Sequence, residues 1–452
     1  MAETIAENAA TALERLDDLL ARARRAGADA ADAVLFSGAA LSVSCRLGAR
    51  ETVERSESTD LGLRVLLGRR QGLVSSSDLS ARALDELVAR ALAMARTATE
   101  DPYCGLAPAE RLAADLPGLD LCDPEEPSTA SLGERALAAE DAARAVAGVT
   151  NSEGAEAGWQ RGAAALATSH GFRGAYDTSR HRLSVAVLAG EGTAMERDWD
   201  YAAARHAADL DPPAEIGRRA GERAVKRLRP RKVASARVPI VFDPRVANSL
   251  VRHFASAVTG TAVARGTSFL RERMGQAVFA DGVEIVDDPH RRRGLASRPF
   301  DGEGVATRRH MLVDQGRLTT WLLDSSSARQ LGLATTGHAG RGTGSPPAPG
   351  ASNLYLAPGA PTPGALMADI EQGLYVTELI GFGVNPVTGD YSRGAAGFWI
   401  EHGELGYPVS ELTIAGNLVD MFKALSPARD LEFRRGVDAP TVRVEGMTVA
   451  GT

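Results

Sequence analysis

The feature that most constrains the fold of this chain is a glycine-rich segment near its C-terminus, Thr377 to Asn417. It reads TELIGFGVNPVTGDYSRGAAGFWIEHGELGYPVSELTIAGN, and its glycines alternate with aromatic side chains. Glycine has no Cβ atom, so the backbone can turn sharply or accept a second backbone at close range. A dense run of glycines between strand-like stretches therefore predicts a tightly constrained backbone in this region.

Composition indicates a soluble globular protein of two or three domains. The chain has 452 residues, of which 44% are hydrophobic and 24% charged, with a net charge of −7. This charge gives no general attraction to nucleic acid. No run of 18 or more apolar residues occurs, so no membrane span is expected.

The N-terminal sequence and the cysteine content favour a cytoplasmic location. The first residues, MAETIAENAATALERL, carry acids where a signal peptide needs a basic patch and an apolar core. Cys45, Cys104 and Cys122 are too few and too irregularly spaced for a disulfide framework. We therefore expect a reducing, cytoplasmic setting.

Periodicity predicts helices alternating with strands in the first half of the chain, and mainly short strands and turns after Val238. The segment Arg229–Lys232 has the character of a hinge between two domains. One helix stands out beyond it, over residues 244–259, and a second is expected over 325–331. Residues 337–363 are rich in Gly, Pro, Ser and Ala, which predicts a mobile loop rather than packed structure.

A basic cluster occupies the helix predicted after Pro212 and its exit. It comprises Arg218, Arg219, Arg223, Lys226, Arg227, Arg229, Arg231 and Lys232. Nucleic-acid binding would need aromatic platforms or a basic domain around the cluster, whereas its flanks are acidic or neutral and Glu215 and Glu222 lie on the same helix. We interpret the cluster as a solvated helix face whose cations lie near the negative end of the helix dipole.

The sequence lacks the common catalytic motifs. There is no G-x-S-x-G elbow and no Walker A sequence, and none of the eight histidines belongs to an H-E-x-x-H pair. A lone histidine is more often a surface or core residue than a metal ligand. Standard motifs therefore leave the function open.

The glycine-rich segment and several others, taken together, resemble the TldD/PmbA family, formerly called modulators of DNA gyrase, and most closely its PmbA (TldE) branch. The matching segments are Gly62–Val65, Ser75–Ser80, Val149–Gly154, Gly294–Asp301, Asp324–Arg329, Thr336–Gly340 and Gly389–Trp399. The resemblance implies a two-subunit zinc peptidase whose subunits pair around a cavity and hold extended peptides beside a strand. It also implies an α+β fold, with an N-terminal α/β domain (residues 1–230) and a β-rich, barrel-like C-terminal domain (237–452).

The zinc ligands implied by the TldD branch are missing here. In that branch a helix carries an HExxxH motif, and a cysteine of the C-terminal domain completes the site. The corresponding helix in this chain offers only His253, within Arg252-His-Phe-Ala-Ser-Ala257. All three cysteines precede residue 123. A hydrolytic zinc needs about three protein ligands, so we expect no metal and no catalytic residue in this chain.

We therefore predict a non-catalytic, peptide-binding subunit that pairs with a TldD-like subunit, which holds the zinc. Two alternatives stay open. One is a self-sufficient hydrolase drawing on His310, His338, Glu378, Asp390 or Glu401. The other is a non-enzymatic regulator of a DNA gyrase-related system.

The glycine-rich segment supplies the candidate contact residues for a peptide or the partner subunit. They are Gly389, Asp390, Arg393, Gly394, Gly397 and Trp399. Close backbone approach explains both the glycines and the aromatic anchor. A tight turn within this chain's own sheet would explain them equally well.

Overall fold

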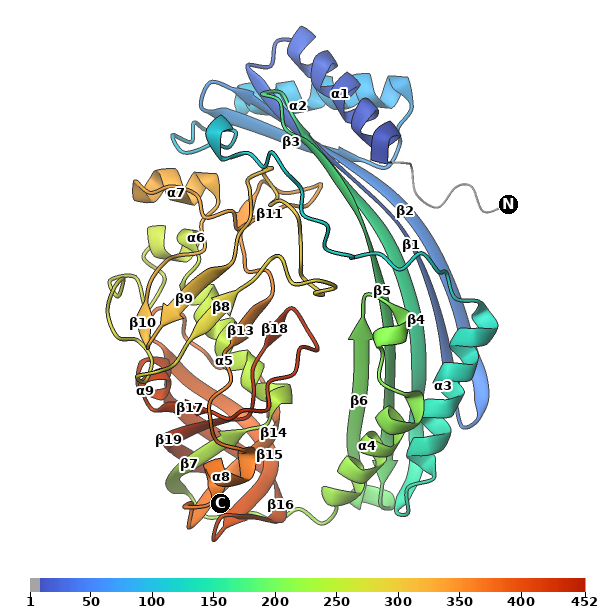
Figure 1. The fold of residues 1–452 in the computed structure, drawn as a ribbon, viewed down its shortest axis with the longest axis vertical. Helices are drawn as coiled ribbons and strands as arrows, with labels where there is room; N and C mark the ends of the chain where they lie inside the picture. The colour runs from blue at the N-terminus through green and yellow to red at the C-terminus, as the bar shows by residue number, and fades with distance from the viewer. Residues whose placement is uncertain (1–8, 452) are drawn as a thin grey trace.

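The chain folds into two parts, and the C-terminal part lies against the concave side of a long, curved sheet formed by the N-terminal part (Figure 1). The computed structural model describes residues 9–451. Residues 1–8, which carry part of the argument about a signal peptide, lie outside the described residues. None of the described helices is long and apolar enough to cross a membrane.

The N-terminal part is built on a six-stranded antiparallel sheet in the order β3-β2-β1-β4-β5-β6. The strands are β1 (Ala30–Arg46), β2 (Ala49–Leu67), β3 (Arg70–Ser76), β4 (Val149–Thr168), β5 (Arg173–Ala189) and β6 (Glu196–Ala204). The helices are α1 (Ala9–Arg25), α2 (Ala81–Thr97), α3 (Thr129–Arg144) and α4 (Pro213–Lys226), with short 3-10 turns η1 (Ala109–Arg111), η2 (Gly192–Ala194) and η3 (Ala207–Asp209).

The alternation of side chains along β1 explains how this part is layered. Successive residues of a strand point to opposite faces of the sheet. Leu35 packs under α1 and α2, whereas Val43 packs under α3 and α4 at the other end of the same strand. Val34 points to the concave face and packs with Phe300 of the C-terminal part. One face thus holds all four helices, and the other receives the C-terminal part.

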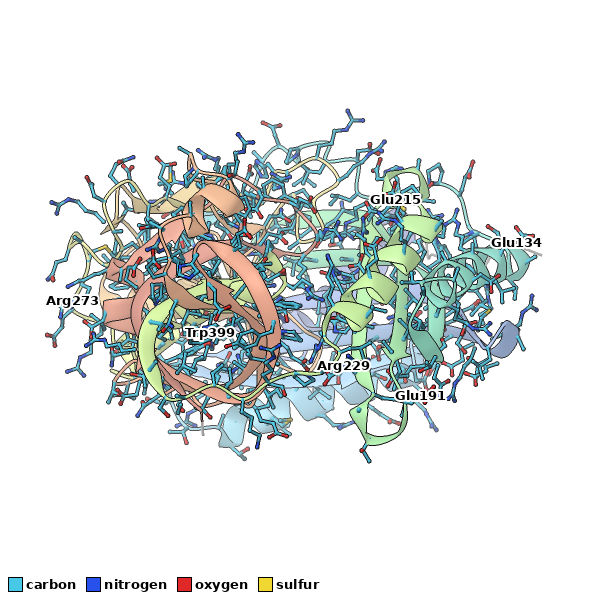
Figure 2. The ribbon with its side chains drawn as sticks, turned by 90° about the horizontal axis from the view of Figure 1, so that it is seen from below. Glu134, Glu191, Glu215, Arg229, Arg273 and Trp399 are labelled. Carbon is cyan, nitrogen blue, oxygen red and sulfur yellow. The ribbon has the colours of Figure 1, made fainter. Side chains whose placement is uncertain are left out.

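The C-terminal part contains a closed barrel of five strands, which confirms the predicted α+β class with a barrel-like second half. Its sheet runs β16-β15-β14-β7-β19-β17. An additional pairing of β16 with β19 closes the first five of these strands into the ring seen in Figure 2, and β17 pairs with β19 beside it. The strands are β7 (Ala236–Phe242), β14 (Gln372–Ile380), β15 (Asp390–Glu401), β16 (Glu404–Asn417), β17 (Leu425–Pro427) and β19 (Val442–Ala450).

Short elements complete the C-terminal part. A five-stranded sheet in the order β10-β9-β8-β13-β18 contains β8 (Ile285–Asp287), β9 (His310–Asp314), β10 (Arg317–Leu318), β13 (Leu354–Leu356) and β18 (Val437–Asp438). The remaining pair is β11 (Ala339–Gly340) with β12 (Ala348–Pro349). The helices are α5 (Pro244–Ala257), α6 (Gly260–Ala264), α7 (Ser325–Leu331), α8 (Pro363–Met367) and α9 (Leu418–Lys423).

The prediction that residues 337–363 form a loop without packed structure is wrong. This segment contributes β11, β12 and β13, and both Ser352 and Asn353 are buried. Two buried carboxylates hold it by accepting backbone hydrogen bonds, Asp301 from the Ala339 amide and Asp287 from the Ser352 amide. Small residues are suited to a mobile loop, but they are equally suited to tight packing. Composition alone therefore does not distinguish the two, and the prediction rested on composition.

The segment predicted to be a hinge connects the two parts along the outside of the barrel. Arg229 has a positive φ of 60° and is labelled in Figure 2. Arg231 donates its backbone N–H to the Pro408 carbonyl of β16 at 2.8 Å, and its guanidinium lies 4.4 Å from the centroid of the Tyr407 ring. The end of the connection is therefore attached to the barrel.

Candidate functional site

Helix α5 is the element on which catalytic relatives are expected to carry zinc ligands. Asp243 caps its first turn by accepting a hydrogen bond from the Arg245 amide at 2.9 Å, and Pro244 occupies the first position. One face of the helix packs into the core of the C-terminal part. His253 is half-buried, edge-on to the Tyr391 ring of β15 with the ring centroids 6.1 Å apart.

The surroundings of His253 disfavour its protonated form. Burial and the nearby positive charge of Arg393 both lower the pKa of His253. Within the described part of the chain, His253 Nε2, the Tyr391 hydroxyl and Arg393 Nε are buried without hydrogen-bond partners. Buried polar atoms are normally paired. This group of three side chains, which we call the α5–β15 polar group, therefore holds three unpaired polar atoms in the interior beside α5.

The residues around α5 do not fit a zinc ion. Within residues 9–451, no group of three or more His, Cys, Asp or Glu side chains is arranged to hold a metal. The charged neighbour of His253 is the cation Arg393, not a carboxylate. A catalytic zinc takes three protein ligands with N, O or S donors, and the side chains around α5 do not supply them.

The six predicted contact residues all lie on or just before β15, and they differ in exposure. Asp390 is exposed and accepts hydrogen bonds from Thr388 and Asn417, which lower its pKa. Arg393 is half-buried in the α5–β15 polar group. Trp399 is 5% exposed and belongs to the core of the barrel part.

The glycines of this set meet close neighbours within the chain itself. Gly389 has a φ of +82°, a conformation that favours glycine. A Cβ atom on Gly397 would lie 1.9 Å from the Tyr375 carbonyl oxygen of β14, and one on Gly394 would lie 3.2 Å from the Ile380 side chain. The barrel's own packing thus accounts for Gly397. Contact of the six residues with a peptide or partner subunit stays a prediction.

The residues of the alternative hydrolase do not assemble into one site. His310 and His338 are neighbours, with ring centroids 5.0 Å apart, and both are buried. Burial, with His338 nearby, lowers the pKa of His310 to about 4. His338 Nε2 lies 3.2 Å from Asp287 Oδ2, and the Ser352 hydroxyl donates to that same oxygen at 2.5 Å. The Ser352 hydroxyl therefore forms a hydrogen bond with a carboxylate, whereas an activated serine nucleophile would form one with a histidine base.

The three acids of that alternative lie apart from these histidines. Glu378 forms an ion pair with Arg227 at 2.5 Å. Asp390 and Glu401 stand at opposite ends of β15, and a strand rises about 3.3 Å per residue, so the two carboxylates cannot act on one substrate bond. No shared active site results.

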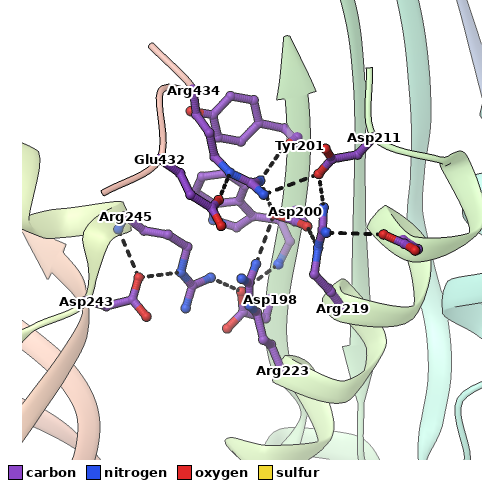
Figure 3. Close-up of polar contacts among 12 residues, drawn as sticks. Asp198, Asp200, Tyr201, Asp211, Arg219, Arg223, Asp243, Arg245, Glu432 and Arg434 are labelled. Atoms are coloured by element: carbon purple, nitrogen blue, oxygen red, sulfur yellow. Dashed lines mark hydrogen bonds and ion pairs between the residues drawn. The ribbon is translucent and has the colours of Figure 1, made fainter. Parts of the chain in front are cut away.

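The interpretation of the basic cluster as a solvated helix face is wrong for its central residues, which pair with buried acids of β6 (Figure 3). Arg219 and Arg223 contact the two Asp200 oxygens at 2.6 and 2.9 Å. Across the interface Arg245 reaches Asp198 at 2.7 Å, while Arg434 reaches Asp211 at 3.2 Å. The missed signal was the alternation Glu196-x-Asp198-x-Asp200, which places three acids on one face of a strand.

Comparisons with known proteins cover almost the whole chain. Sequence models of the PmbA/TldA metallopeptidase family match residues 31–95 (domain 1), 122–228 (central domain) and 235–451 (C-terminal domain). The metalloprotease PmbA of Escherichia coli O157:H7 is 41% identical over 425 residues, covering 94% of this chain and 92% of that protein. A PmbA homologue of Haemophilus influenzae is 40% identical over 434 residues, covering 95% and 94%.

Solved structures share the same fold. A Bacteroides thetaiotaomicron protein described as a modulator of DNA gyrase superposes with a TM-score of 0.89 at 27% identity, covering 97% of this chain and 98% of its own. TldE of Thermococcus kodakarensis superposes with a TM-score of 0.86 at 20% identity, covering 97% and 100%. Sequence and structure agree, and the chain belongs to the PmbA/TldD metallopeptidase family.

Proposed function

We propose that this chain is the zinc-free, peptide-binding subunit of a two-subunit metallopeptidase, and that a TldD-like partner carries the zinc. One observation carries the proposal. Helix α5 presents His253 beside the cation Arg393, and no group of three His, Cys, Asp or Glu side chains among the described residues is arranged to hold a metal. A cation next to an imidazole opposes metal binding through charge repulsion.

One feature supports a role in holding peptide. It is a hollow of about 750 Å³ along β1, β2, β4 and β5 of the N-terminal sheet. Its polar lining includes Ser42, Glu54, Arg55, Gln160, Arg180 and Arg182. Such a lining suits an extended, polar main chain better than a compact apolar ligand.

The test measures zinc and cleavage for the chain alone and with a TldD-like protein encoded in the same organism. We expect no stoichiometric zinc and no cleavage of an unstructured peptide from the isolated chain. The co-purified complex should hold zinc and cleave the peptide. About one zinc per isolated chain, retained after mild chelation, would overturn the proposal.

A substitution at His253 sharpens this test. His253→Ala should leave the zinc content of the complex unchanged, because the proposal gives this residue no role as a ligand. Arg393→Gln serves as a second variant, since it removes the neighbouring cation and leaves every potential ligand in place. Loss of zinc from the His253→Ala complex would show that this chain completes the metal site.

A further inference from the structure

A separate hollow of about 280 Å³ lies where the concave face of the N-terminal sheet meets the C-terminal part. Its sheet side is apolar, formed by Val34, Phe36 and Leu166. Tyr176 and Phe300 continue this apolar wall, with their rings edge to face and centroids 5.3 Å apart. A volume of this size accommodates about one amino-acid side chain with its terminal group, at the small end of known ligand sites.

Two arginines stand on the opposite wall. Arg341 follows β11, and its side chain is only 2% exposed. Its Nη2 forms an ion pair with Asp32 Oδ1 at 2.5 Å, but Nε and Nη1 have no hydrogen-bond partner in the described part of the chain. Arg298 donates to the Ala339 and Gly350 carbonyls, and its Nε is likewise buried and unpaired. Guanidinium donors that are buried and unpaired are costly unless a guest accepts them.

The charge balance around this hollow leaves room for an anion. Asp32 is shared, because Arg64 Nε binds its other oxygen at 2.9 Å while Arg341 pairs with Oδ1. Burial raises the pKa of Asp301, and it raises that of Glu303 to about 7 with a further contribution from Asp301. Three guanidiniums, those of Arg64, Arg298 and Arg341, thus face fewer than three full negative charges near neutral pH.

We propose that this hollow binds the carboxylate of an apolar acid, with Arg341 and Arg298 receiving the carboxylate and the aromatic wall receiving the apolar body. Guanidinium groups match carboxylates through paired N–H donors, and the match is strongest where water is excluded. Two sources share this chemistry, the carboxyl terminus of a peptide that ends in an apolar residue and a free aryl or alkyl carboxylic acid. For the peptide source the inference rests on the proposed function; for the free acid it does not.

The experiment compares three probes on the full chain by calorimetric titration. They are a short N-acetylated peptide ending in Phe with a free carboxylate, the same peptide as its C-terminal amide, and 3-phenylpropionate. We expect the free carboxylate to bind at least tenfold more tightly than the amide. Equal affinity of 3-phenylpropionate and the peptide acid would identify a free acid as the ligand, whereas much tighter binding of the peptide acid would identify a chain terminus.

Two variants address the two walls of the hollow. Ala164 lines the hollow, and Ala164→Leu fills it without changing a charged residue; Arg341→Gln removes the guanidinium of Arg341 while Asp32 keeps Arg64. Each should weaken binding of the acid at least tenfold. Controls are Ala203→Leu on β6 and Arg173→Gln, which removes an exposed ion pair with Asp17. Both should bind within twofold of the natural chain.

Several results would overturn the inference. They are equal binding of acid and amide, undiminished binding by Ala164→Leu, and no binding of either acid at millimolar concentration. If Arg341→Gln does not fold, Ala164→Leu and the acid-to-amide comparison still decide the matter. Equal binding of acid and amide would leave the proposed peptide-binding subunit intact. Conversely, zinc held by the isolated chain would remove that proposal without affecting the binding of 3-phenylpropionate.

Discussion

Arg245, in the first turn of α5, forms an ion pair with Asp198 of β6, with Nη1 and Oδ1 2.7 Å apart (Figure 3). Asp198 is 2% exposed and also receives Arg227 at 3.7 Å. One buried carboxylate thus connects the helix that carries His253 to the edge strand of the N-terminal sheet and to the end of α4.

Asp198→Ala should destabilise the folded chain by about 3 kcal/mol, because it leaves two partly buried guanidiniums without this carboxylate. Urea unfolding would measure the loss. Glu222→Ala is the matched control, since Glu222 forms an exposed pair with Arg218 on α4 at 2.7 Å, and such pairs contribute about 0.5 kcal/mol. Equal losses in the two variants would mean that the interface pair contributes no more than a surface pair.

Gly397→Ala and Gly394→Ala should behave differently although both lie on β15. A Cβ atom at position 397 would meet the Tyr375 carbonyl at 1.9 Å, so we expect a loss of about 3 kcal/mol or an unfolded chain. At position 394 the nearest atom is the Cβ of Ile380, 3.2 Å away. Ile380 is 60% exposed and is the last residue of β14, where a small shift of the strand end gives room. We expect a change within about 0.5 kcal/mol there.

Thermal unfolding of the two variants checks this contrast. A well-folded Gly397→Ala protein would show that β14 and β15 can separate without cost. Gly394→Ala, if folded as expected, becomes the variant with which to test assembly with the zinc-bearing subunit. Unaltered assembly and cleavage would remove Gly394 from the contact surface.

The sequence allowed the architecture to be predicted better than the dimensions of its elements. Helix α7 has the predicted bounds, and the resemblance to the TldD/PmbA family implied the barrel-like second half. The first half of β2 is not predictable from periodicity, because its sequence ARETVERSESTD is polar on both faces. Its residues are exposed on both sides as well, so no apolar alternation marks them, and only backbone pairing with β1 makes them a strand.

Glu303 should make the chain less stable as the pH rises from about 4.5 to 7. Burial, together with the nearby Asp301 carboxylate, raises the pKa of Glu303 to about 7, against 4.5 for the free side chain. Within this window the folded chain keeps a proton that the unfolded chain has released. The stabilisation from this retained proton is therefore fully present below pH 4.5 and is lost as the pH rises through 7. The free energy of unfolding falls by about 3 kcal/mol across this window.

Urea unfolding of the natural chain and of Glu303→Gln across this pH range isolates the effect. The glutamine can still accept the Ser325 amide hydrogen bond, which is 2.8 Å long to Glu303 Oε2, but it cannot ionise. The stability of the natural chain relative to the variant should fall between pH 4.5 and 7 and stay constant above. A difference that is constant or rises with pH would show that Glu303 is ionised in the folded chain.

The α5–β15 polar group could be predicted only in part. His253 was recognised as the remaining histidine on the zinc-type helix, and Arg393 as a contact residue. Their proximity was not predictable, because it depends on how β15 passes α5 within the barrel part. The hollow with Arg341 was not predictable for a similar reason, since its walls come from β1, β4, β5, residues 298–302 and residues 339–341, which are far apart in the sequence.

Asp287→Ala should release the segment from Gly337 to Asn353, which small residues had led us to expect as a mobile loop. The buried Asp287 carboxylate accepts hydrogen bonds from the Ser352 amide at 2.6 Å and hydroxyl at 2.5 Å, and it pairs with His338 at 3.2 Å. We expect slow hydrogen exchange for this segment in the natural chain. In the Asp287→Ala variant, hydrogen exchange in this segment should be at least tenfold faster. The variant should also lose about 3 kcal/mol of stability, because several buried donors lose their acceptor.

The control is Asp314→Ala, which removes an exposed acid at the end of β9. It should change neither the exchange rate nor the stability. Fast exchange in the natural chain would show that this segment is a mobile loop after all. It would also argue against a rigid wall around Arg341.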